Sequence, residues 1–210
     1  MAGSELIRVP IFPLAGALLF PRTQLPLHIF EPRYRAMVKD ALAGERLIAM
    51  VQPRDSNEPP AVFEIGCLGR IIGSEQLPDG RYNIVLQGIH RIRIAEEAQV
   101  STPYRQVDAE CARFRLEEEE PLPIAQRADL ERECRRYAEA LGYAVDWQAV
   151  AQLDDQMLVN GIAQIIPLEL GGKQALLEAT GLLARADLLV QFMQFQRMVP
   201  GGPDLSETMQ

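Results

Sequence analysis

"LHIFEPRYRAM", residues 27–37, is the stretch in which an extended segment changes into a helix. Pro32 suits the first position of a helix, where its missing N–H costs no hydrogen bond. Glu31 precedes it, where a carboxylate can cap free N–H groups and meet the positive end of the helix. A helix is therefore predicted over residues 31–43, after the extended segment "LPLHIF" at residues 25–30.

His28 and Glu31 are three residues apart, a spacing that two ligands of a metal site can have on a helix. Such a pair faces one another only when both residues lie on the same helix. Because Pro32 starts the helix after His28, we predict no metal or acid-base site here. The second histidine, His90, lies on a predicted strand without a carboxylate at metal-binding spacing, and we expect it to be half-exposed.

Strand patterns surround this junction over the first half of the chain. The stretches are "LIRVPIF" (6–12), "RLIAMVQ" (46–52), "CLGRIIGSEQLPDGRYNIVLQGIHRIRIAE" (67–96) and "YRQVDAECARF" (104–114). Pro78-Asp79-Gly80 predicts a hairpin turn, because each residue suits the backbone angles of a turn. The last stretch alternates and predicts a half-buried strand. Repeated glycines predict a sheet that curls into a small barrel.

Helical patterns follow the glutamate run "RLEEEEPLP" at residues 115–123. Helices are predicted over residues 124–141, ending at Gly142, and over 147–165, stopped by Pro167. "GKQALLEA" (172–179) and "LLARADLLVQFMQFQRM" (182–198) predict two more, with a helix stop at Gly171-Gly172 and a restart at Lys173. The predicted fold class is α+β, with a β-rich lobe at 1–116, a helical lobe at 117–199 and a flexible tail at 200–210.

Composition and charge limit the classes of function. The chain has 210 residues, 48% hydrophobic and 24% charged, as in an ordinary globular protein. Residues 1–115 carry 14 Lys and Arg against 13 Asp and Glu, whereas residues 116–210 carry 7 against 16, so nucleic-acid binding is not expected. Basic residues on the first helix and the pair Arg91 and Arg93 are predicted to lie on solvated faces.

The cysteines and the apolar runs predict a cytoplasmic protein. Cys67, Cys111 and Cys134 are widely spaced and form no C-x-x-C pair, which argues against a disulfide framework or a zinc ribbon. Cys111 and Cys134 are predicted on buried faces. The apolar N-terminal run is interrupted by prolines and no apolar stretch reaches 18 residues, so we expect neither a secretory signal nor a membrane span.

No catalytic, cofactor or metal residue is predicted. No serine lies in a G-x-S-x-G motif, and no cysteine has a histidine-containing signature beside it. "LGGKQ" (170–174) is similar to the end of a phosphate loop, but Pro167 stands where the motif needs glycine and Gln174 where it needs Ser or Thr. The protein is therefore expected not to be an enzyme.

Three segments together, residues 9–42, 65–94 and 171–189, resemble the N-terminal substrate-recognition domain of ATP-dependent Lon proteases. The motifs are the proline-punctuated "FPL", "LFP" and "LPLHIFE", the strands at Gly66–Ile71 and Gly88–Ile94, and "KQALLE" at 173–178. The resemblance is strongest to stand-alone bacterial proteins with this domain. It implies a six-stranded, PUA-like barrel lobe followed by a helical lobe. Full-length Lon adds an ATP-dependent unfolding motor and a serine-lysine protease, which we expect this chain to lack.

The resemblance implies a non-catalytic, cytoplasmic module that binds unfolded or apolar polypeptide segments and works beside a separate protease. The candidate peptide-binding surface is Phe30, Arg33, Tyr34 and Met37, although the same positions also fit an ordinary buried helix stripe. Two alternatives stay open: an RNA-binding PUA-like protein, and a small-molecule sensor with a pocket between the lobes. No cofactor and no oligomeric state are predicted.

Overall fold

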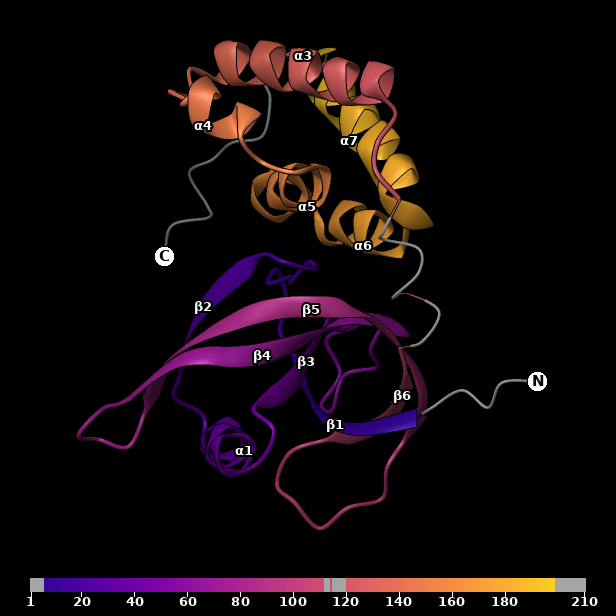
Figure 1. The fold of residues 1–210 in the computed structure, drawn as a ribbon. Helices are drawn as coiled ribbons and strands as arrows, with labels where there is room; N and C mark the ends of the chain where they lie inside the picture. Colours follow the sequence, from indigo (N-terminus) through magenta and orange to yellow (C-terminus); the bar gives the residue numbers. More distant parts are fainter. Residues whose placement is uncertain (1–5, 112–113, 115–119, 199–210) are drawn as a thin grey trace.

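Six strands and one helix form the N-terminal lobe of the computed structural model, which describes residues 6–111, 114 and 120–198 (Figure 1). The elements are β1 (Leu6–Pro13), β2 (Gln24–Ile29), α1 (Pro32–Ala43), β3 (Leu47–Val51), β4 (Ile65–Gln76), β5 (Tyr82–Glu97) and β6 (Gln106–Glu110). The strand order is β2-β5-β4-β3-β1-β6, and β5 also pairs with β6. That second pairing closes five strands into a ring, and the predicted hairpin at residue 79 joins β4 to β5.

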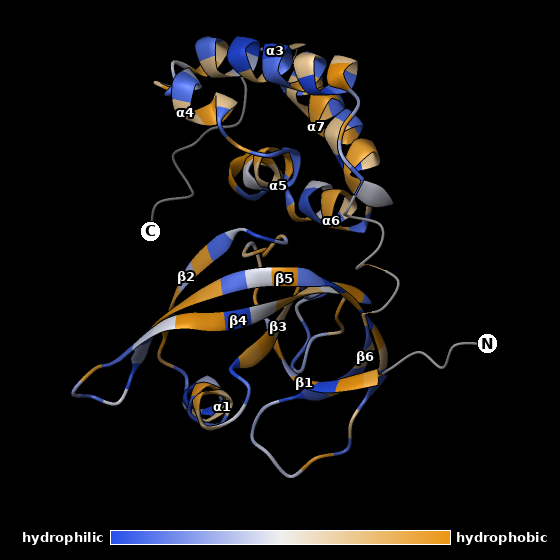
Figure 2. Cartoon of the chain, in the orientation of Figure 1, coloured by the Kyte–Doolittle hydropathy of each residue, from blue (hydrophilic) through white to orange (hydrophobic). Residues whose placement is uncertain are grey.

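Strand β5 can pair with three strands, β2, β4 and β6, because it is long and bent. Its first half pairs with β2 and its last residues pair with β6, and register shifts interrupt the β4–β5 and β5–β6 ladders. Bulges of this kind bend a strand and raise its twist, which ring closure requires. Hydrophobic and hydrophilic bands alternate along β4 and β5 (Figure 2). The predicted curled sheet is confirmed.

The predicted junction at Pro32 is confirmed, with one correction. Helix α1 begins at Pro32 and Glu31 occupies the N-cap position, but the Glu31 side chain caps no backbone N–H. Its carboxylate instead accepts a hydrogen bond from Arg33 Nε at 2.9 Å. A charged partner two residues away binds the carboxylate in place of the neutral N–H groups.

The sheet lobe has two hydrophobic clusters. One draws residues from all five strands of the ring and fills its interior: Val9, Ile11, Ala49, Val51, Leu68, Ile92, Val107, Ala109 and Cys111. The other runs from α1 through the loop after β1 and continues into the helical lobe. The two lobes therefore share one core.

Five helices form the second lobe in the part of the chain that the structure describes. They are α3 (Ile124–Leu141), α4 (Trp147–Ala151), α5 (Asp155–Ile165), α6 (Leu170–Glu178) and α7 (Gly181–Met198). The α+β order, strands first and helices second, is confirmed. Helix α3 ends at Gly142 in the left-handed conformation, φ 71°, as predicted.

Two helix predictions were wrong. The helix expected over 147–165 is divided into α4 and α5, because the Asp154 side chain accepts a hydrogen bond from Met157 N at 2.9 Å and starts a new helix. The stop expected at Gly171-Gly172 does not occur either. Both glycines lie inside α6, which begins at Leu170 after its N-cap residue Glu169.

Buried polar side chains join the two lobes. Asn160 Nδ2 donates to the carbonyl of Pro21 at 3.0 Å, and its Oδ1 accepts from Arg185 at 2.6 Å. Arg91 of β5 donates to the carbonyls of Leu177 and Ala179 at the end of α6, at 3.0 and 2.6 Å. Arg91 is fully buried, so its predicted solvated position was wrong. A guanidinium at the C-terminal end of a helix satisfies carbonyls that have no partner within the helix.

Other predictions fall partly outside the described residues. The predicted lobe boundary at residue 116 lies in the segment 115–119, and the predicted tail at 200–210 lies in 199–210. Among residues 6–111, 114 and 120–198, no helix is long and apolar enough to cross a membrane.

Candidate functional site

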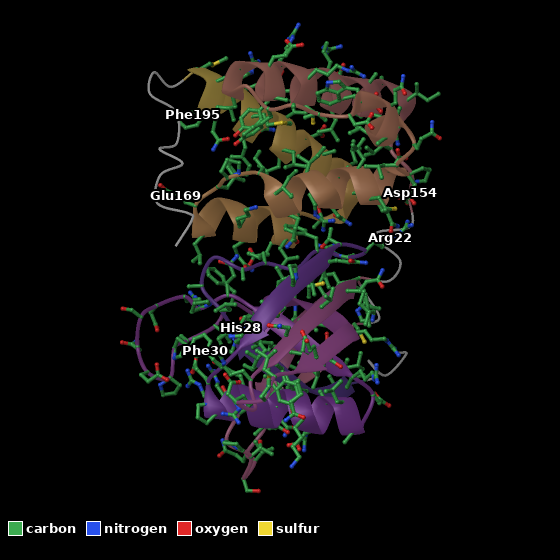
Figure 3. The ribbon with its side chains drawn as sticks, turned by 90° about the vertical axis from the view of Figure 1, so that its left-hand side faces the viewer. Arg22, His28, Phe30, Asp154, Glu169 and Phe195 are labelled. Carbon is green, nitrogen blue, oxygen red and sulfur yellow. The ribbon has the colours of Figure 1, made fainter. Side chains whose placement is uncertain are left out.

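The four residues predicted as a peptide-binding surface do not form one surface. Phe30 is 62% exposed beside His28, with ring centroids 6.4 Å apart (Figure 3). Tyr34 packs on Phe12 and Met37 is 0% exposed, so both belong to the core. Arg33 lies over the Tyr34 ring and binds two carboxylates. The buried-stripe interpretation fits Tyr34 and Met37, and Phe30 is the apolar surface that remains.

A larger apolar site lies in the helical lobe. Helices α3, α4, α5 and α7 line a groove that is open to solvent and has a volume of about 510 Å³. Its lining includes Tyr137 and Ala138 from α3, Trp147 from α4, Met157 and Ile162 from α5, and Met193 from α7. Met157 is 40% exposed and Ile165, at the end of α5, is 79% exposed. The volume lies within the range of ordinary ligand sites, about 300–1,000 Å³.

Gly161 keeps the floor of the groove open. It lies in the middle of α5, where glycine is less favourable than alanine by roughly 0.5–1 kcal/mol. A Cβ added at Gly161 would meet no atom within 4 Å. Neither tight packing nor an unusual backbone angle requires a glycine here, and because Gly161 lines the groove, a larger side chain at this position would enter it.

Charged side chains fix one end of the groove. Glu131 is the charged residue of the lining, and Arg127 binds it at 2.9 Å. Arg127 also binds Asp155 at 2.6 Å and the carbonyl of Leu153 at 2.9 Å, so it ties α3 to the start of α5. The two carboxylates raise the pKa of Arg127 above its ordinary value.

Hydrogen bonds fix the other end. Tyr137 Oη donates to Gln196 Oε1 at 2.7 Å, and Gln196 Nε2 donates to the carbonyl of Pro167 at 2.7 Å. This chain links α3, α7 and the loop between α5 and α6. Arg135 lies over the Trp147 ring at 4.6 Å and holds α4 against α3. These contacts join the walls of the groove to one another.

Two titratable groups of the lining, Cys134 and Tyr137, are poor catalysts. Burial, with Glu133 and Glu131 nearby, raises the pKa of the Cys134 thiol to about 12. Burial also raises the pKa of Tyr137 to about 12. Both groups stay protonated at neutral pH, whereas a cysteine nucleophile acts as the thiolate. What the groove can do chemically is bury apolar surface.

Lys173 belongs to the stretch that is similar to the end of a phosphate loop, but in the structure it binds the end of α5. Its Nζ donates to the carbonyls of Ala163 and Gln164 at 2.9 and 2.7 Å, at the end of α5. Burial lowers its pKa to about 8. The lysine thus fastens α6 to α5. Among the described residues, no group of three or more His, Cys, Asp and Glu could hold a metal ion.

The groove escaped prediction because its walls come from helices separated along the chain. Local periodicity identified α3 and α7 correctly but gave no reason to bring them around α5. Two signals were present in the sequence. A glycine stands in the middle of a helical pattern at residue 161, and Asp154 is a strong helix N-cap residue.

A closed sheet lobe, a helical lobe fused to it by a common core, and an open apolar groove define a two-lobed α+β module. The chain belongs to the family of the ATP-dependent protease La (LON) substrate-binding domain, which matches residues 8–194. The resemblance noted in the sequence is confirmed.

Relatives and solved structures agree with this family. Lon protease 2 of Myxococcus xanthus is 26% identical over 91% of this chain, and Lon protease 2 of Sorangium cellulosum is 28% identical over 87%. The chain spans 24% of the length of each. The N-terminal domain of a Mycobacterium avium complex Lon protease has the same fold, with a TM-score of 0.70, 17% identity, and coverage of 90% of this chain and 98% of that one. A Lon N-terminal domain protein from Xanthomonas campestris has the same fold as well. Its TM-score is 0.67 and its sequence identity 19%, and the match covers 89% of this chain and 99% of that one.

Proposed function

We propose that the protein is a non-catalytic module that recognises polypeptide segments by burying their apolar side chains in the groove of the helical lobe. The observation that carries the proposal is the open groove itself, about 510 Å³ with an apolar lining. Folded proteins rarely leave such surface exposed unless something binds there. Each large apolar side chain that a ligand buries contributes roughly 1.5–3 kcal/mol.

The family supports the polypeptide as ligand, because its name describes a substrate-binding domain of a protease. The chain matches about a quarter of the length of its Lon relatives, at 24%. We propose that it recognises segments without unfolding or cutting them, in the cytoplasm, beside a separate protease. The exposed Phe30 is proposed as a secondary contact on the sheet lobe.

Charge supports a polypeptide over RNA. Residues 124–166, which supply most of the groove, carry four arginines against seven Asp and Glu residues. A phosphate backbone is repelled by such a surface. A small apolar molecule also fits the volume of the groove.

A matched pair of variants tests the proposal. Gly161→Leu fills the groove, because a side chain there points into open space. Gly171→Leu adds the same side chain in α6, also in open space but outside the groove. The ligand is a reduced and alkylated polypeptide that cannot fold, labelled with a fluorophore for anisotropy measurements.

The native chain and Gly171→Leu are expected to bind this polypeptide equally, and Gly161→Leu at least tenfold more weakly. Thermal unfolding followed by circular dichroism confirms that both variants stay folded. Equal binding by Gly161→Leu would locate recognition elsewhere. Absence of polypeptide binding by the native chain, together with stabilisation by small apolar compounds, would replace a polypeptide with a small molecule as ligand.

A further inference from the structure

We propose that the segment bound in this groove is an amphipathic helix with basic residues on its solvent-facing side, and not an extended strand. This inference rests on the proposed function and names the class of polypeptide that the groove accepts. Three observations carry it: how the polar atoms of the groove are used, how large the groove is, and which charges surround it.

Several polar atoms around the groove already have partners. The Glu131 carboxylate binds Arg127, and the Tyr137 hydroxyl donates to Gln196. The carbonyls of Leu153 and Pro167, in the loops at the two ends, accept from Arg127 and Gln196. Most of the remaining lining lies on helices, whose interior N–H and C=O groups bond within the helix.

An extended ligand would meet no row of free donors and acceptors here. Each buried backbone group without a hydrogen bond costs roughly 1–3 kcal/mol, and an extended segment carries two such groups per residue. A helix satisfies these groups internally and presents only side chains. The sheet lobe could pair with a strand at an edge, but the groove, built from helices, favours a helical ligand.

The size of the groove agrees with one face of a helix. A cavity of about 150 Å³ holds a benzene ring, so 510 Å³ has room for about three large apolar side chains. Residues at positions i, i+4 and i+7 of a helix present three such side chains on one face. Met157, Ile162 and Ile165 of α5 would pack against them.

The charges around the groove select the polar face of the ligand. At one end, Arg127 is shared between Glu131 and Asp155, which leaves one net negative charge. Asp154 stands beside them as the N-cap of α5 and contacts Arg22 of the sheet lobe (Figure 3). Arg22 pairs with Asp154 and Arg135 lies over Trp147 of the lining, but residues 124–166 as a whole carry seven Asp and Glu against four Arg. A helix with Lys or Arg beside its apolar face is complementary to this net negative surface, and complementary charges speed association and fix orientation.

Four synthetic peptides of equal length test the inference by fluorescence anisotropy. The first places three leucines at i, i+4 and i+7 of an otherwise lysine- and alanine-rich helix. The second has the same composition with leucines at alternate positions, and the third replaces two central alanines of the first by proline. The fourth replaces the lysines of the first by glutamate.

We expect the first peptide to bind at least tenfold more tightly than the second, the third and the fourth, and to gain helical circular dichroism when it binds. Gly161→Leu should abolish this binding and Gly171→Leu should leave it unchanged. Each comparison uses the full chain, and several salt concentrations separate the charge contribution from the apolar one.

The outcomes separate this inference from the proposed function. If the alternating or proline peptides bind as tightly as the first and Gly161→Leu still blocks them, the groove binds polypeptides but the helical ligand is overturned. If the acidic peptide binds as tightly, the basic face is overturned. If no peptide and no unfolded polypeptide binds in a way that Gly161→Leu blocks, the proposed function fails as well.

Discussion

The two lobes bury their apolar residues to different extents. Five strands of the sheet lobe close into a ring whose interior is filled, with Val9, Ile11 and Ile92 almost fully buried. The helical lobe leaves an apolar groove open although a shared core already holds it to the sheet. The shared core already holds the helical lobe to the sheet lobe, so the open groove is not needed to join them. This difference supports the proposal that the helical lobe carries the binding surface and the sheet lobe is its scaffold.

Two glycines show the same difference between the filled sheet lobe and the open groove of the helical lobe. Gly88 of β5 is needed because a side chain there would run into the carbonyl of Phe20. Gly161 of α5 has open space around its missing side chain. Substituting each glycine should therefore change stability in opposite directions.

Gly88→Ala is expected to have the largest effect, a loss of about 3 kcal/mol or more in the free energy of unfolding. The added methyl group overlaps a backbone atom, which cannot move as a flexible side chain would. Urea unfolding followed by circular dichroism measures the loss. Gly73→Ala is the matched control in the same sheet, because its Cβ meets only the Val85 side chain at 3.7 Å. A similar loss in both variants would contradict the role of the close approach.

Asn160→Ala is expected to cost about 2 kcal/mol in the free energy of unfolding. It removes two buried hydrogen bonds: the donor to the Pro21 carbonyl at 3.0 Å, which joins the two lobes, and the acceptor that Arg185 of α7 uses at 2.6 Å within the helical lobe. The matched control is Asn83→Ala in the sheet lobe, where the amide contacts His28 at an exposed site. We expect the control to lose less than about 0.5 kcal/mol.

Denaturant titrations of both asparagine variants give this difference directly. The native chain should unfold in one transition, since the lobes share a core. An Asn160→Ala loss no larger than that of Asn83→Ala would mean that the buried polar contacts add little to the junction of the lobes.

The two lysines of the chain, Lys39 and Lys173, allow a comparison by pH. Burial lowers the pKa of Lys173 from 10.5 to about 8. Between these values the unfolded chain holds a proton that the folded chain has released, so stability contributed by this group rises with pH. Below about pH 8 both states are protonated and the contribution no longer changes.

The measurement is the free energy of unfolding at pH 7.5, 8.5 and 9.5 for the native chain, Lys173→Met and Lys39→Met. In the native chain and in Lys39→Met, Lys173 should raise the free energy of unfolding by about 1 kcal/mol per pH unit. Lys173→Met should lack this rise. Parallel profiles for all three proteins would show that Lys173 keeps its proton in the folded chain.

The sequence revealed the parts of the fold that depend on local chemistry. Pro32 determined the start of α1, Pro78-Asp79-Gly80 the hairpin, and Gly142 the end of α3, because each acts through its own backbone angles. Alternation predicted β6 for the same reason, since the pattern of one strand reports which face is covered.

Contacts between distant segments were beyond such reasoning. Arg91 was expected in solvent because nothing near it in the sequence shows that α6 lies against β5. Glu31 was expected to cap a helix, but its carboxylate accepts a hydrogen bond from Arg33 instead. The groove needs four helices at once, and the candidate residues Tyr34 and Met37 were chosen from a stripe that also serves a core.

Gly161→Ala has the smallest expected effect on stability, a gain of about 0.5–1 kcal/mol, opposite in sign to Gly88→Ala. The methyl group removes conformational freedom from the unfolded chain and meets no atom in the folded one. Gly171→Ala in α6 should give a comparable gain, and thermal unfolding compares the two. Their ligand affinity should differ: Gly161→Ala narrows the groove and weakens peptide binding severalfold, whereas Gly171→Ala binds as the native chain does. A glycine whose loss stabilises the fold and weakens binding has a role in recognition, so unchanged affinity in Gly161→Ala would assign Gly161 no such role.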